Sequence, residues 1–309
     1  MMWLLVVPLG VCLVAIAAAT RRSSAGSMAA GNVAGPAACC GLAAGGAPRL
    51  VAVGGWWLAT ALAVQIRQGW AVWPEEAWRQ ASWAILLFGV VLAWRMPGWA
   101  SGAVVRGPDG PPGEFGSGRW PLAGVAAVLV AYLAMPTGDG WDEVVPLHHR
   151  WMAAMVSACL VNVWAIERLI LRGGGRWALW VIVAGIAAPT AYAAATYGGL
   201  AEWGGAALVA TVAFAVAASL GRSFAPAVAF PAIATAAALA ASTRFYSFET
   251  HPGWLHAIIL FLPAIVAAAD RPLAGKSAGF RVGAAGLLAV LLLGLIVATL
   301  FLGEPEDQW

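Results

Sequence analysis

Long apolar runs with almost no charge are the feature that most constrains how this chain can fold. An α-helix needs roughly 20 apolar residues to cross the hydrocarbon layer of a membrane, and its backbone must satisfy its own hydrogen bonds there. About ten runs approach that length, at residues 2–20, 50–66, 77–95, 120–135, 151–170, 177–197, 203–220, 224–242, 254–269 and 280–302. They predict an all-α fold, a polytopic transmembrane helical bundle of about ten spans.

The composition excludes an ordinary water-soluble domain. Hydrophobic residues make up 62% of the chain and charged residues 10%, against about 25% charged in a typical soluble protein. The net charge is only +3, and no cluster of basic residues is interleaved with aromatic ones, so nucleic acid is not expected as a partner. The expected partners are the lipid bilayer and either other membrane-protein subunits or further copies of the chain.

The loops between the runs are short, which predicts a single integral membrane domain over residues 1–309 with no sizeable soluble domain. Residues 28–49 are rich in Gly and Ala and include Pro36, which predicts a flexible or re-entrant inner segment. The alternative for this segment is a further span, packed through its small residues. Residues 96–119 are rich in Pro and Gly and predict an irregular inner loop.

The basic residues predict the orientation, because short cytoplasmic loops retain Arg and Lys. Thirteen of the seventeen basic residues fall on one side of the ten-span arrangement, and four fall on the other: Arg67, Arg79, Arg150 and Arg244. Both termini are therefore expected to be extracytoplasmic, and the composition favours a bacterial cytoplasmic (inner) membrane. Residues 2–19 resemble the apolar core of a signal peptide, but Arg21 and Arg22 follow it and favour a retained anchor. Many of the 18 tryptophans lie near predicted span ends, where indoles are favoured.

Few polar side chains fall inside the predicted spans. Glu167 lies near the inner end of its run, close to Arg168 and Arg172, which predicts a partly solvated ion pair. Gln65 and Asn162 are expected to form hydrogen bonds between helices, with a substrate contact as the alternative. A carboxylate or histidine relay at mid-span is not expected, and this argues against ion-coupled transport.

Histidines and acidic residues gather on the predicted outer face. This candidate cluster contains His148, His149, His251, His256, Asp142, Glu143 and Glu249. Imidazole and carboxylate groups suit zinc or another divalent metal, with His251 and His256 as candidate ligands, and the same groups suit acid–base chemistry. The sequence contains no HExxH or other spaced ligand motif, so interfacial histidines with a structural role are the simpler interpretation.

Three function classes remain open. Minimal loops and Ala-rich runs marked by Pro189, Pro226 and Pro231 favour a permease-like protein for a small solute or lipid. A structural or accessory subunit of a membrane protein complex is the first alternative. A membrane enzyme with a His/carboxylate site, with or without a metal, at the outer face is the second, and no catalytic residue is assigned.

Overall fold

The computed structural model is a bundle of helices, and no strand occurs in the part of the chain that it describes. That part comprises residues 3–30, 41–69, 75–94, 119–137, 141, 145–175, 177–222, 224–247, 251–273 and 275–302. The helices are α1 (Trp3–Ala30), α2 (Gly41–Gln68), α3 (Ala77–Trp94), α4 (Arg119–Ala134), α5 (Val145–Leu169), α6 (Ala178–Thr196), α7 (Gly198–Ser219), α8 (Ala229–Tyr246), α9 (Gly253–Ala269) and α10 (Ala278–Leu302). Three short helices join them: η3 (Ile170–Gly174), η4 (Ala225–Val228) and η5 (Arg271–Leu273). The all-helical prediction is confirmed.

Each predicted apolar run coincides with one of these helices. Within the described residues, seven helices are long and apolar enough to cross a membrane, as expected of an integral membrane protein. Three further apolar helices are shorter, at Val6–Arg21, Ala77–Ala93 and Trp120–Ala134. The number of spans above seven therefore stays a prediction.

The first two helices are longer than the apolar runs that predicted them. Residues 28–30 and 41–49 are helical, and the flexible or re-entrant character expected for residues 28–49 as a whole stays a prediction. Alanine is the strongest helix former, and here it outweighs the interspersed glycines. Residues 31–40 and nearly all of the expected 96–119 loop lie outside the described residues, and Arg119 already belongs to α4.

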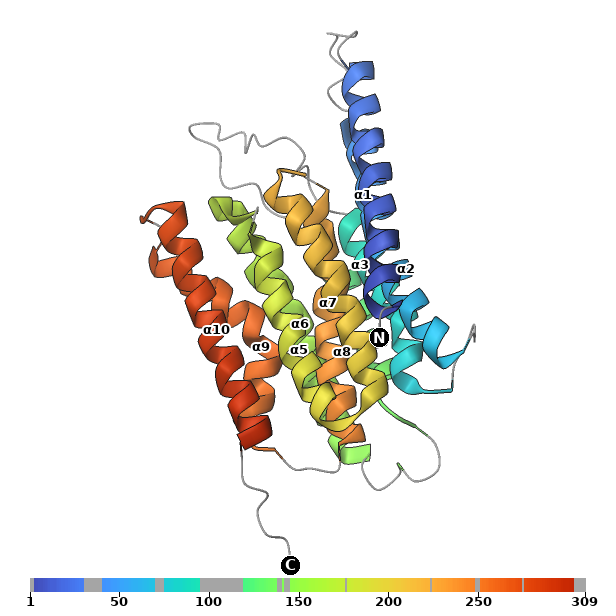
Figure 1. Cartoon of the computed structure of the whole chain (residues 1–309), viewed down its shortest axis with the longest axis vertical. Coiled ribbons are helices and arrows are strands. Elements are labelled where there is room, and N and C mark those ends of the chain that lie inside the picture. Colours follow the sequence, from blue (N-terminus) through green and yellow to red (C-terminus); the bar gives the residue numbers. More distant parts are fainter. Residues whose placement is uncertain are drawn as a thin grey trace, which may run out of the picture.

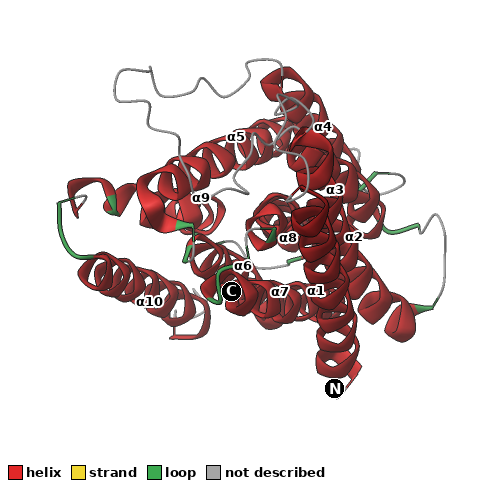
Figure 2. Cartoon of the chain, turned by 90° about the horizontal axis from the view of Figure 1, so that it is seen from above, coloured by secondary structure: helices red, strands yellow, loops and turns green. Residues whose placement is uncertain are grey.

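Helix α8 occupies the middle of the bundle. Seen from above, its neighbours surround it (Figure 2), and every side chain from Ala229 to Thr243 is buried. Small residues permit this: a β-carbon added to Gly89 of α3 would lie 3.0 Å from the ring of Pro231. The hydroxyl of Ser242 reaches α4, where it donates to the carbonyl of Ala134 over 3.4 Å. The centre is thus filled mainly by alanine and by close neighbouring backbone.

Helix α10 lies at the edge of the bundle and packs on α6 and α9 (Figure 1). It has a mean hydropathy of 2.7, yet only 17% of it is buried within the chain. An ion pair joins its first turn to the end of α9: Arg281 Nε donates to Asp270 Oδ1 and Arg281 Nη2 to Asp270 Oδ2, each over 2.6 Å. Asp270 is fully buried, so this two-point contact holds the two helices together at that end.

The filled centre predicts that a larger side chain in α8 will be costly. Ala238→Leu adds three carbons at a fully buried position and should lower the free energy of unfolding by about 1–3 kcal/mol through overpacking. Unfolding of the purified chain in an SDS titration measures this. Val290→Leu, at an exposed position on α10, is the control and should change little.

The Asp270–Arg281 pair predicts a second stability effect. Arg281→Gln leaves a fully buried carboxylate without its cation and should cost about 3 kcal/mol in the same unfolding titration. Adding Asp270→Asn to that variant should recover most of the loss. Arg271→Gln is the control, because this neighbouring arginine is exposed. An equal loss in the two single variants would contradict the prediction.

Candidate functional site

Two of the predicted histidines meet a buried tyrosine at one end of the bundle, where α5 and α9 begin and α6 and α8 end. The hydroxyl of Tyr192, on α6, lies 3.3 Å from Nε2 of His256, on α9. The ring of Tyr192 also packs edge-on against the rings of His251 and His256, with centroids 5.3 and 5.5 Å apart. Tyr192 is fully buried and His256 is 7% exposed, so water barely reaches this hydrogen bond.

Aromatic side chains from two more helices extend this group. Trp151 of α5 packs edge-on against His256, with centroids 5.3 Å apart. Phe245 of α8 lies edge-on to both Trp151 and His148, at 6.2 and 4.7 Å. We call these six residues the histidine–aromatic cluster: His148, Trp151, Tyr192, Phe245, His251 and His256. The cluster joins α5, α6 and α8 to the start of α9.

The fourth histidine is not part of this cluster. His149 is exposed, whereas its neighbour His148 is buried, because consecutive helical residues point about 100° apart. Nε2 of His148 is buried and has no hydrogen-bond partner in the structure. Three of the four predicted histidines therefore share one end of the bundle, held mainly by ring contacts.

The described residues supply no set of metal ligands. Among them, no group of three or more His, Cys, Asp or Glu side chains is placed to hold a metal ion. The acidic members of the predicted cluster, Asp142, Glu143 and Glu249, lie outside the described residues. His148, His251 and His256 pack against aromatic rings, whereas His149 is exposed.

Asn162 of α5 bonds to the backbone of α9. Its side-chain Nδ2 donates to the carbonyl of Leu260 over 2.8 Å, and its Oδ1 accepts from the N–H of Ala264 over 2.9 Å. In a regular α-helix these two backbone groups pair with each other, because residue i donates to residue i−4. Pro263 lies between them and has no N–H, which deprives the carbonyl of Ile259 of its helical donor. Asn162 therefore forms hydrogen bonds with two backbone groups of α9 next to Pro263.

At Pro263, α9 also packs closely on α6. A β-carbon added to Gly185 of α6 would collide with the ring of Pro263, so no larger residue fits there without movement. His256, Leu260 and Ala264 follow at four-residue intervals and lie on one face of α9. This face contacts the histidine–aromatic cluster at one end and Asn162 further along.

Glu167 is more deeply buried than the sequence predicts. Its side chain is 2% exposed, whereas Arg168 is exposed and places its guanidinium carbon 5.8 Å from the ring centroid of Trp164. Helical geometry again separates consecutive residues, so Glu167 faces the bundle while Arg168 faces outward. With His148 and Asn162, Glu167 makes up a buried polar series along α5.

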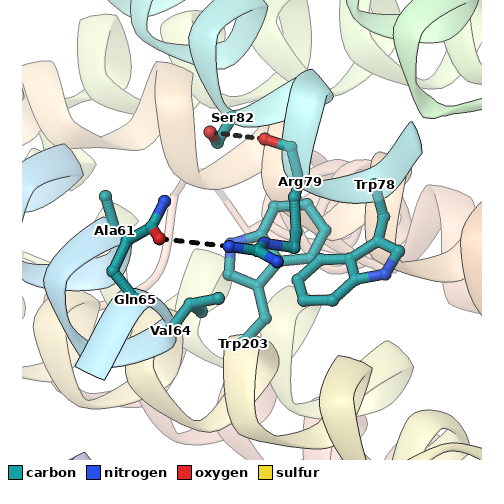
Figure 3. A pocket seen from close by; sticks show the side chains of 7 residues that line it. All are labelled: Ala61, Val64, Gln65, Trp78, Arg79, Ser82 and Trp203. Carbon is teal, nitrogen blue, oxygen red and sulfur yellow. Dashed lines mark hydrogen bonds between the residues drawn. The ribbon is translucent and has the colours of Figure 1, made fainter. Parts of the chain in front are cut away.

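A polar pocket between α2, α3 and α7 was not foreseen from the sequence (Figure 3). Arg79 is only 8% exposed and donates from Nη2 to Gln65 Oε1 over 3.1 Å and to the carbonyl of Gly69 over 3.0 Å. Its Nη1 donates to Glu76 over 3.0 Å. Gln65 thus forms a bond between helices, as the sequence interpretation has it. The sequence feature that could have indicated this site is Arg79, an arginine in the first turn of the apolar run at residues 77–95.

The pocket at Arg79 has little room for a solute. Its volume is about 20 Å³, close to that needed for a single water molecule. The rings of Trp78 and Trp203 line it, with centroids 5.5 Å apart. Because Glu76 balances the charge of Arg79, this site is best understood as a packed polar contact between helices.

Comparison with known proteins yields no relative. No family model, no curated protein and no solved structure matches the chain. Its function is therefore inferred from the buried polar groups around α9.

The Tyr192–His256 hydrogen bond predicts a measurable stability effect. Tyr192→Phe removes only the hydroxyl and leaves Nε2 of His256 unpaired in a buried place, which should cost about 1–3 kcal/mol. Thermal or SDS unfolding of the purified chain measures it. Tyr197→Phe is the matched control, because Tyr197 is 38% exposed and should tolerate the change. Indistinguishable stabilities of the two variants would show that the hydrogen bond contributes nothing.

Proposed function

We propose that this chain is an integral-membrane, permease-like protein for a small solute or a lipid, and that its pathway runs beside α9, along α5 and α6. The observation that carries this proposal is the capture of two α9 backbone groups by Asn162 next to Pro263. Helices with interrupted backbone bonding line the substrate sites of many transporters, because irregular backbone is tolerated in a membrane only inside protein or beside a cavity.

Buried polar residues support the same location. A polar or ionisable side chain inside a membrane is costly and usually has a function. His148, Asn162 and Glu167 on α5, Tyr192 on α6 and His256 on α9 are all buried among otherwise apolar helices. In the middle of the bundle, α8 is filled mainly with alanine, and its buried polar side chains are the hydroxyls of Thr235, Ser242 and Thr243, with no ionisable group among its buried residues. The proposed pathway therefore runs to one side of α8.

The proposed setting is the cytoplasmic membrane of a bacterium. All ten helices are proposed to cross it. The apolar stretches of α1, α3 and α4 are shorter, and their flanking residues are proposed to reach the interface. The distribution of arginines supports a topology in which both termini are extracytoplasmic. The exposed apolar side chains of α10 fit direct contact with lipid.

An accessory subunit is the second candidate, and a groove between α1 and α2 favours it. This groove has a volume of about 460 Å³ and is lined only by small or apolar residues: Gly10, Val11, Val14, Ala15, Ala18, Val51, Gly54, Gly55 and Leu58. Small residues allow a transmembrane helix of a partner to approach closely. An outer-face enzyme gains no ligand set from the described residues and is not proposed.

Flux into vesicles tests the permease proposal. The purified chain, reconstituted in liposomes, is assayed with radiolabelled sugars, amino acids, carboxylates and nucleosides, and with fluorescent phospholipids for lipid movement. Saturable flux of at least one class is expected. Asn162→Leu should lower it about 5- to 150-fold, since lost hydrogen bonds of about 1–3 kcal/mol correspond to that range.

The flux assay has a matched control variant on α2. Gln65→Leu removes another amide, partly buried, that bonds between helices away from α9. It should leave the flux within about twofold of the unmodified chain, a change of under about 0.5 kcal/mol. A chain that is inert with every probe and is isolated only with a tight partner would overturn the permease proposal and favour the accessory subunit.

A further inference from the structure

The two halves of α9 are anchored to different parts of the bundle. The outer half, Gly253 to Leu260, is held by the Tyr192–His256 hydrogen bond and by the edge contact of Trp151. The inner half, Ala264 to Ala269, leads directly to Asp270, whose carboxylate is bound at two points by Arg281 of α10. The outer half thus belongs to the core around α5 and α6, and the inner half is coupled to α10.

Between these two anchors lies Pro263, where the backbone hydrogen bonding of α9 is weakened. Pro263 contributes no N–H, and the pair that would bridge the proline, Leu260 and Ala264, bonds to Asn162. Pro263 also rests directly against Gly185, where α6 offers backbone in place of a side chain. Sharp bends in helices occur at prolines and at places where a side chain inserts into the hydrogen-bond ladder, and both features coincide here.

We propose that α9 pivots at Asn162, so that its inner half and α10 move together while its outer half stays fixed. This proposal rests on the proposed function, in which it supplies the inner gate of the pathway. Helix α10 is suited to such movement because it packs only at one side, on α6 and α9, and otherwise presents exposed apolar side chains. Over its exposed part, a displacement would exchange lipid contacts for lipid contacts.

Asn162 lowers the free-energy cost of the pivot in a membrane. An unsatisfied backbone group in hydrocarbon costs several kcal/mol, so a bare break in α9 would be strongly opposed. The side-chain amide carries both a donor and an acceptor, and it can keep both Leu260 and Ala264 bonded while the two halves tilt. Asn162 is therefore assigned as a positioning residue for the gate.

Distances between spin labels test the pivot without any solute. The full chain, with Cys12, Cys39, Cys40 and Cys159 changed to Ala, is placed in lipid nanodiscs and labelled in pairs. The inner pair is Val125→Cys on α4 with Val282→Cys on α10, and the outer pair is Val125→Cys with Trp254→Cys on α9. All three labelled positions are exposed.

The inner pair should give two distances or one broad distribution, and the outer pair one narrow distance. Asn162→Leu removes the side chain that bonds to the α9 backbone beside the proline, and Pro263→Ala restores the missing N–H, so each should collapse the inner pair to one narrow distance. Pro189→Ala, in α6, is the control and should leave the inner distribution broad. If one variant aggregates, the other still carries the test.

An inner pair as narrow as the outer pair, or a width unchanged by either variant, would overturn the pivot. The flux assay is separate from this measurement. Saturable flux with a single narrow inner distance would refute the pivot alone, whereas a broad inner distance in a chain without flux would refute the transport function and leave the pivot standing.

Discussion

Every backbone N–H and C=O group of a chain in hydrocarbon must find its partner within the protein, and this requirement organises the whole molecule. It makes each apolar run a helix, because a helix satisfies these groups within one segment. It also lets the centre be built from alanine, since α8 needs no side-chain partners and its neighbours can approach until Gly89 of α3 touches Pro231. Dispersion contacts between closely packed helices then stabilise the bundle, as burial from water contributes little between helices in lipid.

Where the helical pattern is interrupted, a side chain completes it. At Pro263 the amide of Asn162 bonds to Leu260 and Ala264, so the interruption in α9 leaves these two groups satisfied. The same helix carries His256, which is bonded to Tyr192 and packed against Trp151. These contacts bring buried polar groups of α5 and α6 together around α9, and they are the reason that the proposed function is placed there.

The buried charged groups Arg79 and Asp270 are likewise bound by nearby polar side chains and backbone carbonyls. Arg79 is buried by sharing its guanidinium among Gln65, Gly69 and Glu76, and Asp270 is buried by a two-point contact with Arg281. Charges removed from water are tolerated when they form hydrogen bonds and ion pairs of this kind, although Nε of Arg79 has no hydrogen-bond partner among the described residues. Both sites lie at helix ends, where short-range partners tie neighbouring helices together.

The sequence by itself determined the helical class and the approximate position of each helix, because the length of an apolar run is a local property. It also identified Gln65 and Asn162 as residues that bond between helices. Only the tertiary structure decided that His148, His251 and His256 share one aromatic cluster while His149 faces away, that Glu167 turns inward, and that Asn162 meets α9 beside Pro263. These facts depend on which helix faces are in contact. In apolar helices with nearly uniform small side chains, the local sequence does not specify these faces, because they are set by packing between residues far apart in the chain.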